Sequence, residues 1–185
     1  MEFPNTGDFL AGRLRDKLSQ DDLEFIESLV AETRQGETGD VLLSRGAVTE
    51  QSTILISGYI FRTIESDNRR FIVGVDVPGD FVDLHGFALK RLDHSIVAAG
   101  PITYGIAPHE RLRDALEHRP RVARALWFAT LLDAARRAAR LGVTISIDIN
   151  FAPRSEARRL EKQDAARQIL ALGPLVKCSH DDLAR

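Results

Sequence analysis

Three histidines in the middle of the chain, His85, His94 and His109, have the side chains best suited to binding a metal ion or haem. Their spacing matches no compact ligand motif such as H-x-H or H-E-x-x-H, so ordinary polar residues are the favoured interpretation. The single cysteine, Cys178, excludes a disulfide framework and a four-thiolate zinc or iron–sulfur site within one chain. We therefore predict no metal and no cofactor. The missing ligand spacing also disfavours a small cupin-like metalloenzyme, and no enzymatic activity is expected.

These side chains belong to a chain of ordinary globular composition. Its 185 residues are 44% apolar and 28% charged, which suits one domain with a buried core and a helical appendage. No apolar run approaches the roughly 20 residues of a membrane span, and the N-terminus lacks the basic start and apolar core of a signal peptide. We expect a cytoplasmic protein without a membrane partner.

The charge is distributed unevenly along the chain. Residues 1–110 carry 10 Lys/Arg and 18 Asp/Glu, a balance of −8, whereas residues 111–185 carry 15 and 9, a balance of +6. A basic second part is expected where that part meets nucleic acid. Arginines on helices, such as Arg136 and Arg158, also commonly form a solvated face, and both interpretations stay open.

Short β-type runs separated by glycine turns dominate the region after the first helix. That helix is predicted to begin at Ser19, in a phrase resembling a capping box, and to end near Thr33, and residues 8–17 are also helix-compatible. Ser66–Arg69 is the clearest hairpin turn. Several short strands at near-regular spacing indicate a barrel or sandwich. The predicted strands are Val41–Leu43, Thr53–Ile56, Tyr59–Ile64, Phe71–Val73, Ser95–Ala98 and Thr103–Ile106.

Two helices are predicted after the strands, one starting at Pro108 and a longer one after Pro120. Apolar residues in 121–141 recur at alternating steps of three and four, the a/d pattern of a helix packed along a partner helix. This pattern predicts a homodimer. The alternative is a helix that lies on its own barrel through a second stripe at Val122, Leu126 and Ala129. The a/d residues are Ala125, Phe128, Leu132, Ala135 and Ala139.

The tail departs from this pattern. Strict alternation in Val143–Phe151 predicts a half-buried strand, and Pro153 and Ser155 open a basic amphipathic helix that ends at Leu172. Ser179–Ala184 resembles another helix cap.

In this order, the elements resemble the sensor half of the Crp/Fnr superfamily of bacterial transcription regulators, the catabolite activator type. The resemblance covers Leu18–Arg140 and implies a β-roll of the cyclic-nucleotide-binding type, a dimerisation helix and a winged helix-turn-helix. In that family a phrase such as Ser179–Ala184 opens the first DNA-binding helix, so the DNA-binding domain is expected to be absent or incomplete in this chain. The residues that carry the resemblance are Leu18–Leu23, Gly39–Leu43 with Gly46, Ile54–Ile60, Val77–Phe81 and Pro108–Leu112.

The ligand site differs from the pattern that the resemblance implies. Cyclic-nucleotide binders of this fold hold the ribose with a Gly-Glu pair and the cyclic phosphate with an arginine before a Ser/Thr. Here no Gly-Glu pair follows the Gly-Asp-Phe turn, and His94 stands where the arginine is expected. A histidine is mostly neutral at pH 7 and lacks the guanidinium fork, and loss of a charge-assisted hydrogen bond costs about 1.5–3 kcal/mol. We therefore predict weak or no cyclic AMP binding.

Two substitutes for the missing groups are considered. Lys90 or Arg91 would supply the cation, although their phrase is more typical of a solvated helix end. Asp83 would replace the ribose-binding glutamate, although an acidic turn residue is the simpler interpretation. The expected pocket residues are Phe81, Asp83, Leu84, His85, Lys90, Arg91, His94 and Ser95.

The sequence thus predicts an α+β protein, with an antiparallel β-roll of the jelly-roll type flanked by helices and a long C-terminal dimerisation helix. The expected divisions are a sensor domain at 1–118, the dimerisation helix at 119–142 and a divergent tail at 143–185. The predicted function is effector sensing in a Crp/Fnr-type regulator that forms a homodimer and binds an unknown small molecule. The alternative is a dimeric ligand- or protein-binding module that does not bind DNA itself.

Overall fold

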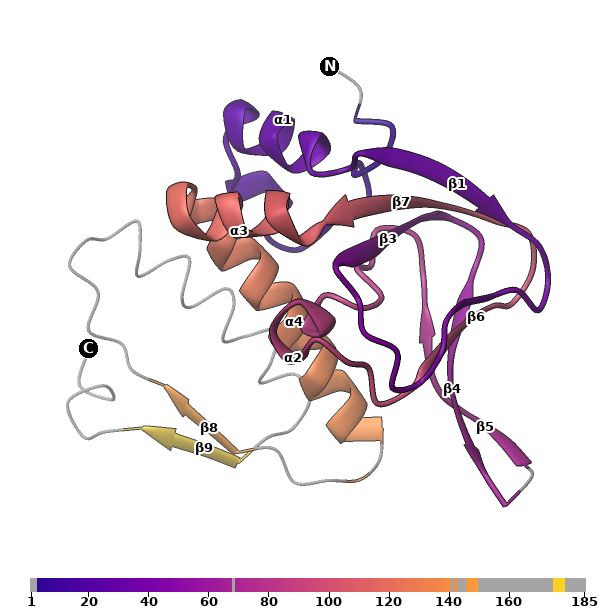
Figure 1. Ribbon diagram of the computed structural model, residues 1–185. Helices are drawn as coiled ribbons and strands as arrows, with labels where there is room; N and C mark the ends of the chain where they lie inside the picture. The colour runs from indigo at the N-terminus through magenta and orange to yellow at the C-terminus, as the bar shows by residue number, and fades with distance from the viewer. Residues whose placement is uncertain (1–2, 68, 141, 143–145, 150–174, 179–185) are drawn as a thin grey trace. The chain divides into compact units, whose positions relative to one another are not determined.

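The computed structural model describes residues 3–67, 69–140, 142, 146–149 and 175–178. The chain divides into two compact units, Met1–Ala129 and Thr130–Arg185. The first unit holds two antiparallel sheets and the helices around them, as Figure 1 shows. The domain boundaries drawn from the sequence at 118 and 142 remain predictions.

The helices begin and end at identifiable signals. Ser19 caps the first helix: its side chain accepts from the Asp22 amide, and the Asp22 carboxylate accepts from the Ser19 amide, which confirms the predicted capping box. Pro108 and Pro120 stand at the starts of the third and fourth helices, as predicted. The helices are η1 (Arg15–Lys17), α1 (Gln20–Ser28), α2 (His85–Leu89), α3 (His109–His118) and α4 (Pro120–Arg140).

The strands form a three-stranded sheet in the order β1-β7-β3 and a four-stranded sheet in the order β2-β6-β4-β5. Every pairing in these two sheets is antiparallel, as expected for a β-roll. The β4–β5 hairpin projects from the sheets and turns at Asp67, whose φ is +51°, where a turn was predicted. The strands are β1 (Glu32–Gly36), β2 (Val41–Leu43), β3 (Gln51–Ser57), β4 (Ile60–Ser66), β5 (Arg69–Asp76), β6 (Ser95–Ala98) and β7 (Ile102–Pro108).

The predicted end of the first helix near Thr33 is wrong. Helix α1 stops at Ser28, and β1 begins at Glu32 and pairs with β7. Strand β1 escaped detection because four of its five residues are exposed and polar, so it has no period-two apolar signal. Residues 8–17 form turns and a short 3₁₀ helix rather than an α-helix.

The interior of the β-roll is filled by aliphatic side chains. One buried cluster contains Leu55, Ile60, Val82, Leu92, Ile96, Ala98 and Ile102. Helix α4 presents apolar residues on more than one side. Val122 and Leu126 of the second stripe are buried, and so are Ala125, Phe128, Leu132 and Ala135 of the a/d stripe.

In the second unit, β8 (Ser146–Ile149) lies within the predicted strand 143–151. It pairs in parallel with β9 (Leu175–Cys178), which the sequence did not reveal. The predicted helix from Ser155 to Leu172 and the cap-like phrase Ser179–Ala184 lie outside the described residues.

Candidate functional site in the β-roll

The turn Val77–Phe81 directly precedes the residues of the candidate site. Gly79 has a φ of +89°, and a Cβ built there would lie 2.3 Å from the carbonyl oxygen of Asp8, so only glycine fits. The Gly79 amide donates to the carbonyl of Leu55, whose own amide donates to the carbonyl of Asp80. The turn therefore attaches the following residues to β3.

Asp83 is the buried carboxyl group that this attachment positions. Its side chain is 1% exposed, and Oδ1 accepts from the backbone amide of Thr53 at 2.6 Å. Burial raises the pKa of Asp83 to about 7, against the opposing effect of the Thr53 hydrogen bond. Asp83 thus anchors the start of α2 to β3, and its exposure does not fit a solvated acidic turn residue.

A second buried charged group was not predicted. Arg62 of β4 donates from Nε and an Nη atom to the carboxylate of Asp76, at 2.9 and 2.5 Å. Both side chains are at most 5% exposed. Gly74 makes room, because a Cβ there would lie 3.2 Å from Cδ of Arg62. The signal in the sequence was an arginine within a predicted strand of aromatic and β-branched residues.

Lys90 lies at the C-terminal end of α2 and contacts the start of α3 rather than the region of His94. Its Nζ is 3.4 Å from Nδ1 of His109 and 3.5 Å from Oε2 of Glu50. Nε2 of His109 is 3.2 Å from Oγ of Ser52, and the ring of Phe87 meets the His109 ring edge-on at 5.1 Å. Burial, and then the charge of Lys90, lowers the pKa of His109.

The remaining predicted pocket residues have separate surroundings. Arg91 is exposed and donates to the carbonyl of Gly46 at 2.7 Å. Ser95 Oγ accepts from the Arg45 amide at 2.9 Å. Phe81 is buried and packs edge-on against Phe9, at 5.4 Å between ring centroids, and Leu84 precedes the first residue of α2. In this arrangement both Lys90 and Arg91 therefore have partners within the protein, and their role as a phosphate-binding cation stays a prediction.

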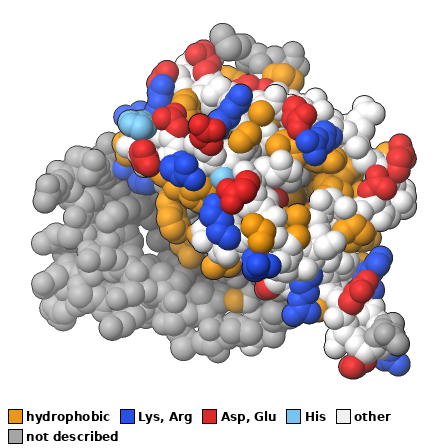
Figure 2. Space-filling view, viewed as in Figure 1, with side chains coloured by type: hydrophobic (Ala, Val, Ile, Leu, Met, Phe, Trp, Pro, Cys, Tyr) orange, Lys and Arg blue, Asp and Glu red, His pale blue; other side chains and the backbone are white. Residues whose placement is uncertain are grey.

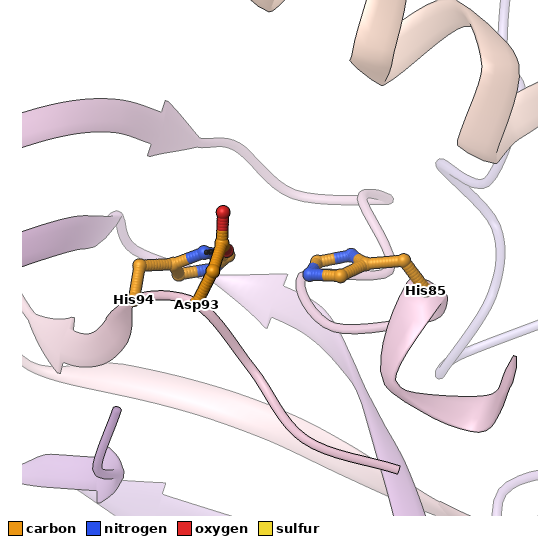
Figure 3. Close-up of side chains that lie close together, drawn as sticks. All are labelled: His85, Asp93 and His94. Atoms are coloured by element: carbon orange, nitrogen blue, oxygen red, sulfur yellow. Dashed lines mark hydrogen bonds and ion pairs between the residues drawn. The ribbon is translucent and has the colours of Figure 1, made fainter. Parts of the chain in front are cut away.

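His85 and His94 lie together, although the sequence spacing did not indicate it. Their ring centroids are 5.4 Å apart, and Nδ1 of His94 is 2.6 Å from Oδ1 of Asp93. Figure 3 shows the two imidazoles facing one another, one from α2 and one from the loop before β6, with the Asp93 carboxylate beside His94. His94 is fully buried, while the Asp93 side chain is 64% exposed. The cluster therefore extends from the interior to the surface.

Two cavities in the described residues lie elsewhere. One, of about 340 Å³, is lined by Phe3, Pro4, Asn5, Gly7, Asp8, Leu55, Ile56 and Gly79. The other lies at the tip of the β4–β5 hairpin and is open to solvent. Neither includes a residue of the predicted pocket.

The basic side chains that follow the β-roll are partly neutralised by α1. Arg119 forms an ion pair with Asp21, Arg121 lies 3.9 Å from Asp22, and Arg111 donates to the carbonyl of Ser28 at 2.6 Å. In the face that Figure 2 shows, basic and acidic side chains of the described residues are interspersed. The charge asymmetry along the sequence is thus reduced at Arg119 and Arg121, whose partners are acidic, while Arg111 keeps its charge against a neutral carbonyl.

Comparison with solved structures identifies the fold. CLP of Xanthomonas campestris, described as a c-di-GMP-responsive global regulator, matches with a TM-score of 0.55 and 21% identity, over 67% of this chain and 65% of that one. A cyclic nucleotide-binding domain from Methylobacillus flagellatus matches with a TM-score of 0.59 and 13% identity, over 67% and 72%. The N-terminal domain of a transcriptional regulator from Streptomyces coelicolor matches with a TM-score of 0.53 and 19% identity, over 70% and 88%.

These likenesses show that the chain has a cyclic-nucleotide-binding-like β-roll, and they confirm the predicted fold class. The chain spans 65% of the length of the CLP chain. No protein-family model matches the sequence, and no curated protein matches it. Among the described residues, no helix combines the length and the apolar character that crossing a membrane requires.

Proposed function

We propose that this chain is the effector-sensing part of a Crp/Fnr-type transcription regulator, without enzymatic activity and located in the cytoplasm. A small molecule binds in the β-roll, and α3 and α4 carry the change to a second subunit. DNA is contacted through a domain of the winged-helix type. The fold, shared with regulator and cyclic nucleotide-binding domains, supports this proposal.

The contact between the end of α2 and the start of α3 carries the proposal. Asp83 and His85 lie just before and at the start of α2. Phe87 in the middle of α2 and Lys90 at its C-terminal end both contact His109, the first residue of α3. A displacement of α2 by a ligand would therefore act directly on α3. Such a contiguous set of packed side chains is a physical route for coupling, and its role needs a coupling measurement.

Homodimerisation through α4 is part of the same proposal. The monomer buries Phe128 and Leu132 of the a/d stripe, whereas Trp127 and Leu131 on the same helix are 64% and 55% exposed. Exposed large apolar side chains on neighbouring turns favour contact with a second copy of α4. We therefore place the centre of the dimer contact at Trp127 and Leu131.

Trp127 also provides the test, because it is the only tryptophan in the chain. The purified protein is analysed by native mass spectrometry for bound small molecules. Any compound found, and cyclic AMP, cyclic GMP and c-di-GMP as probes, is then titrated while Trp127 emission is recorded. We expect at least one of these compounds to bind and to change the emission.

The variant His109→Gln should keep the binding and lose the emission change, because it removes the Lys90 contact to the ring. His118→Gln, on the exposed side of the same helix, is the matched control and should respond like the wild type. Binding without any emission change in the wild-type protein would contradict coupling between the ligand site and α4. It would support the alternative, a dimeric module that does not bind DNA itself.

A further inference from the structure

We propose that His85, Asp93 and His94 form a binding site for a divalent transition-metal ion of the zinc class. One ring nitrogen from each histidine and one oxygen of Asp93 all lie within 4.8 Å of one another. Imidazole and carboxylate are the donors that zinc and non-haem iron use in three-ligand protein sites. The proposal goes beyond the effector-sensing function, since metal binding here does not depend on whether the chain regulates transcription.

The donors are close enough for a site that closes when the ion binds. Zinc lies about 2.0–2.2 Å from nitrogen and carboxylate oxygen in a tetrahedral arrangement, so two of its donors are about 3.4 Å apart. The observed limit is 4.8 Å, so the donors that are farthest apart must approach by more than about 1 Å. His85 is half-buried and the side chain of Asp93 is 64% exposed, so rotation of these two side chains supplies the difference without disturbing the core.

Gly86 explains why the two histidines meet. A Cβ at this position would lie 3.2 Å from Cδ2 of Leu92 and equally close to Cγ2 of Thr49, so a larger residue would push α2 outward. The Thr49 amide donates to the carbonyl of Lys90 and holds the other end of α2 to the same segment. Helix α2 is therefore held against the loop that carries His94, with His85 at its first position.

The surroundings of the histidines suit a metal ligand. Oδ1 of Asp93 lies 2.6 Å from Nδ1 of His94, so these two donors already lie side by side, as two ligands of one ion do. The exposed side chain of Asp93 gives the ion a route from solvent to the buried ring. Nitrogen donors make the site selective for transition metals over calcium and magnesium, which prefer oxygen.

The test uses the full-length protein after treatment with a chelator and equilibrium dialysis against zinc chloride. Metal is quantified by mass spectrometry, and the absorption of the cobalt(II) form reports the ligand geometry. We expect saturable binding of one ion per chain. His85→Ala and His94→Gln should abolish this binding, and Asp93→Asn should weaken it, because a neutral amide oxygen is a poorer ligand than a carboxylate.

The matched control is His118→Ala. His118 is exposed and also has a carboxylate nearby, with Nδ1 2.9 Å from Asp114, so it represents an ordinary surface histidine. This variant should bind zinc like the wild type. Because His94 lies in the core, circular dichroism must first show that His94→Gln is folded. If this variant is unfolded, zinc binding by His85→Ala, where the substituted side chain is only half-buried, provides the test. Absence of saturable binding, or wild-type binding by His85→Ala, would overturn the proposal.

Discussion

His109 is held in one neutral tautomer by its two polar neighbours. The ammonium group of Lys90 can only donate, so Nδ1 of His109 accepts and Nε2–H donates to Oγ of Ser52. A protonated ring would place a second cation beside Lys90 and Arg113, with only the exposed Glu50 to oppose them. This arrangement accounts for the lowered pKa of His109.

A pH effect on stability follows from that lowered pKa. The unfolded chain takes up a proton on this histidine as the pH falls through about 6.5, whereas the folded state resists protonation. The free energy of unfolding should therefore fall more between pH 7.5 and pH 5.5 in the wild type than in His109→Gln. Urea unfolding at both pH values measures the difference, and other titrating groups, including Asp83, are common to both proteins. Equal losses in the two proteins would contradict the assignment.

The buried ion pair between Arg62 and Asp76 leads to a second prediction, which concerns stability. Removal of one partner leaves the other as an uncompensated buried charge, which costs about 3–5 kcal/mol. Arg62→Met should therefore lower the free energy of unfolding by about this amount. The double variant Arg62→Met/Asp76→Leu should recover much of the loss, because neither charge of the pair is then left without its partner. A double variant as unstable as Arg62→Met alone would mean that the pair acts mainly through its packing.

At the scale of elements, α4 combines two apolar surfaces. Most residues of the predicted a/d stripe, including Phe128 and Leu132, are buried within the single chain. Trp127 and Leu131, which are not part of that stripe, are exposed. Periodicity alone does not distinguish these arrangements, because a helix with apolar residues on several sides offers more than one a/d stripe. The choice depends on which other segments cover the helix.

We predict that Trp127→Glu/Leu131→Glu converts a dimer into a folded monomer. The substituted side chains are exposed in the single chain, so their charge harms only an intermolecular contact. Leu132→Glu, at a position that is 2% exposed, should instead destabilise the chain itself, because it buries an unpaired charge. Light scattering measures the mass, and thermal unfolding measures the stability. A wild-type protein that is monomeric at all concentrations would refute the dimer.

Considered as a whole, the molecule has a cyclic-nucleotide-binding-like β-roll, with His94 at the position where the family resemblance implies a phosphate-binding arginine. His94 is buried beside Asp93, Lys90 is directed to Glu50 and His109, and Arg91 donates to Gly46. Lys90 and Arg91, the two candidates to replace the arginine, thus each have another partner.

Cyclic AMP should therefore bind weakly or not at all. Isothermal titration calorimetry at pH 7.5 is expected to give no sub-micromolar dissociation constant, because loss of a charge-assisted hydrogen bond costs at least about tenfold in affinity. Lys90→Ala and Arg91→Ala should leave this result unchanged. Tight binding that one of these substitutions abolishes would show that the affected cation turns toward the ligand.

The sequence by itself determined the strands β2 to β7, the capping box at Ser19, the hairpin turn at Asp67 and the starts of α3 and α4. These features depend on local backbone preferences and short-range periodicity, which neighbouring residues specify. Strand β1 was missed because an exposed polar edge strand has no such signal. Only the tertiary structure decided which remote side chains meet: Arg62 with Asp76, His109 with Lys90, and His85 with His94. The physical reason is that these contacts depend on how segments pack, as Gly86 and Gly74 show by admitting a close approach that no local pattern encodes.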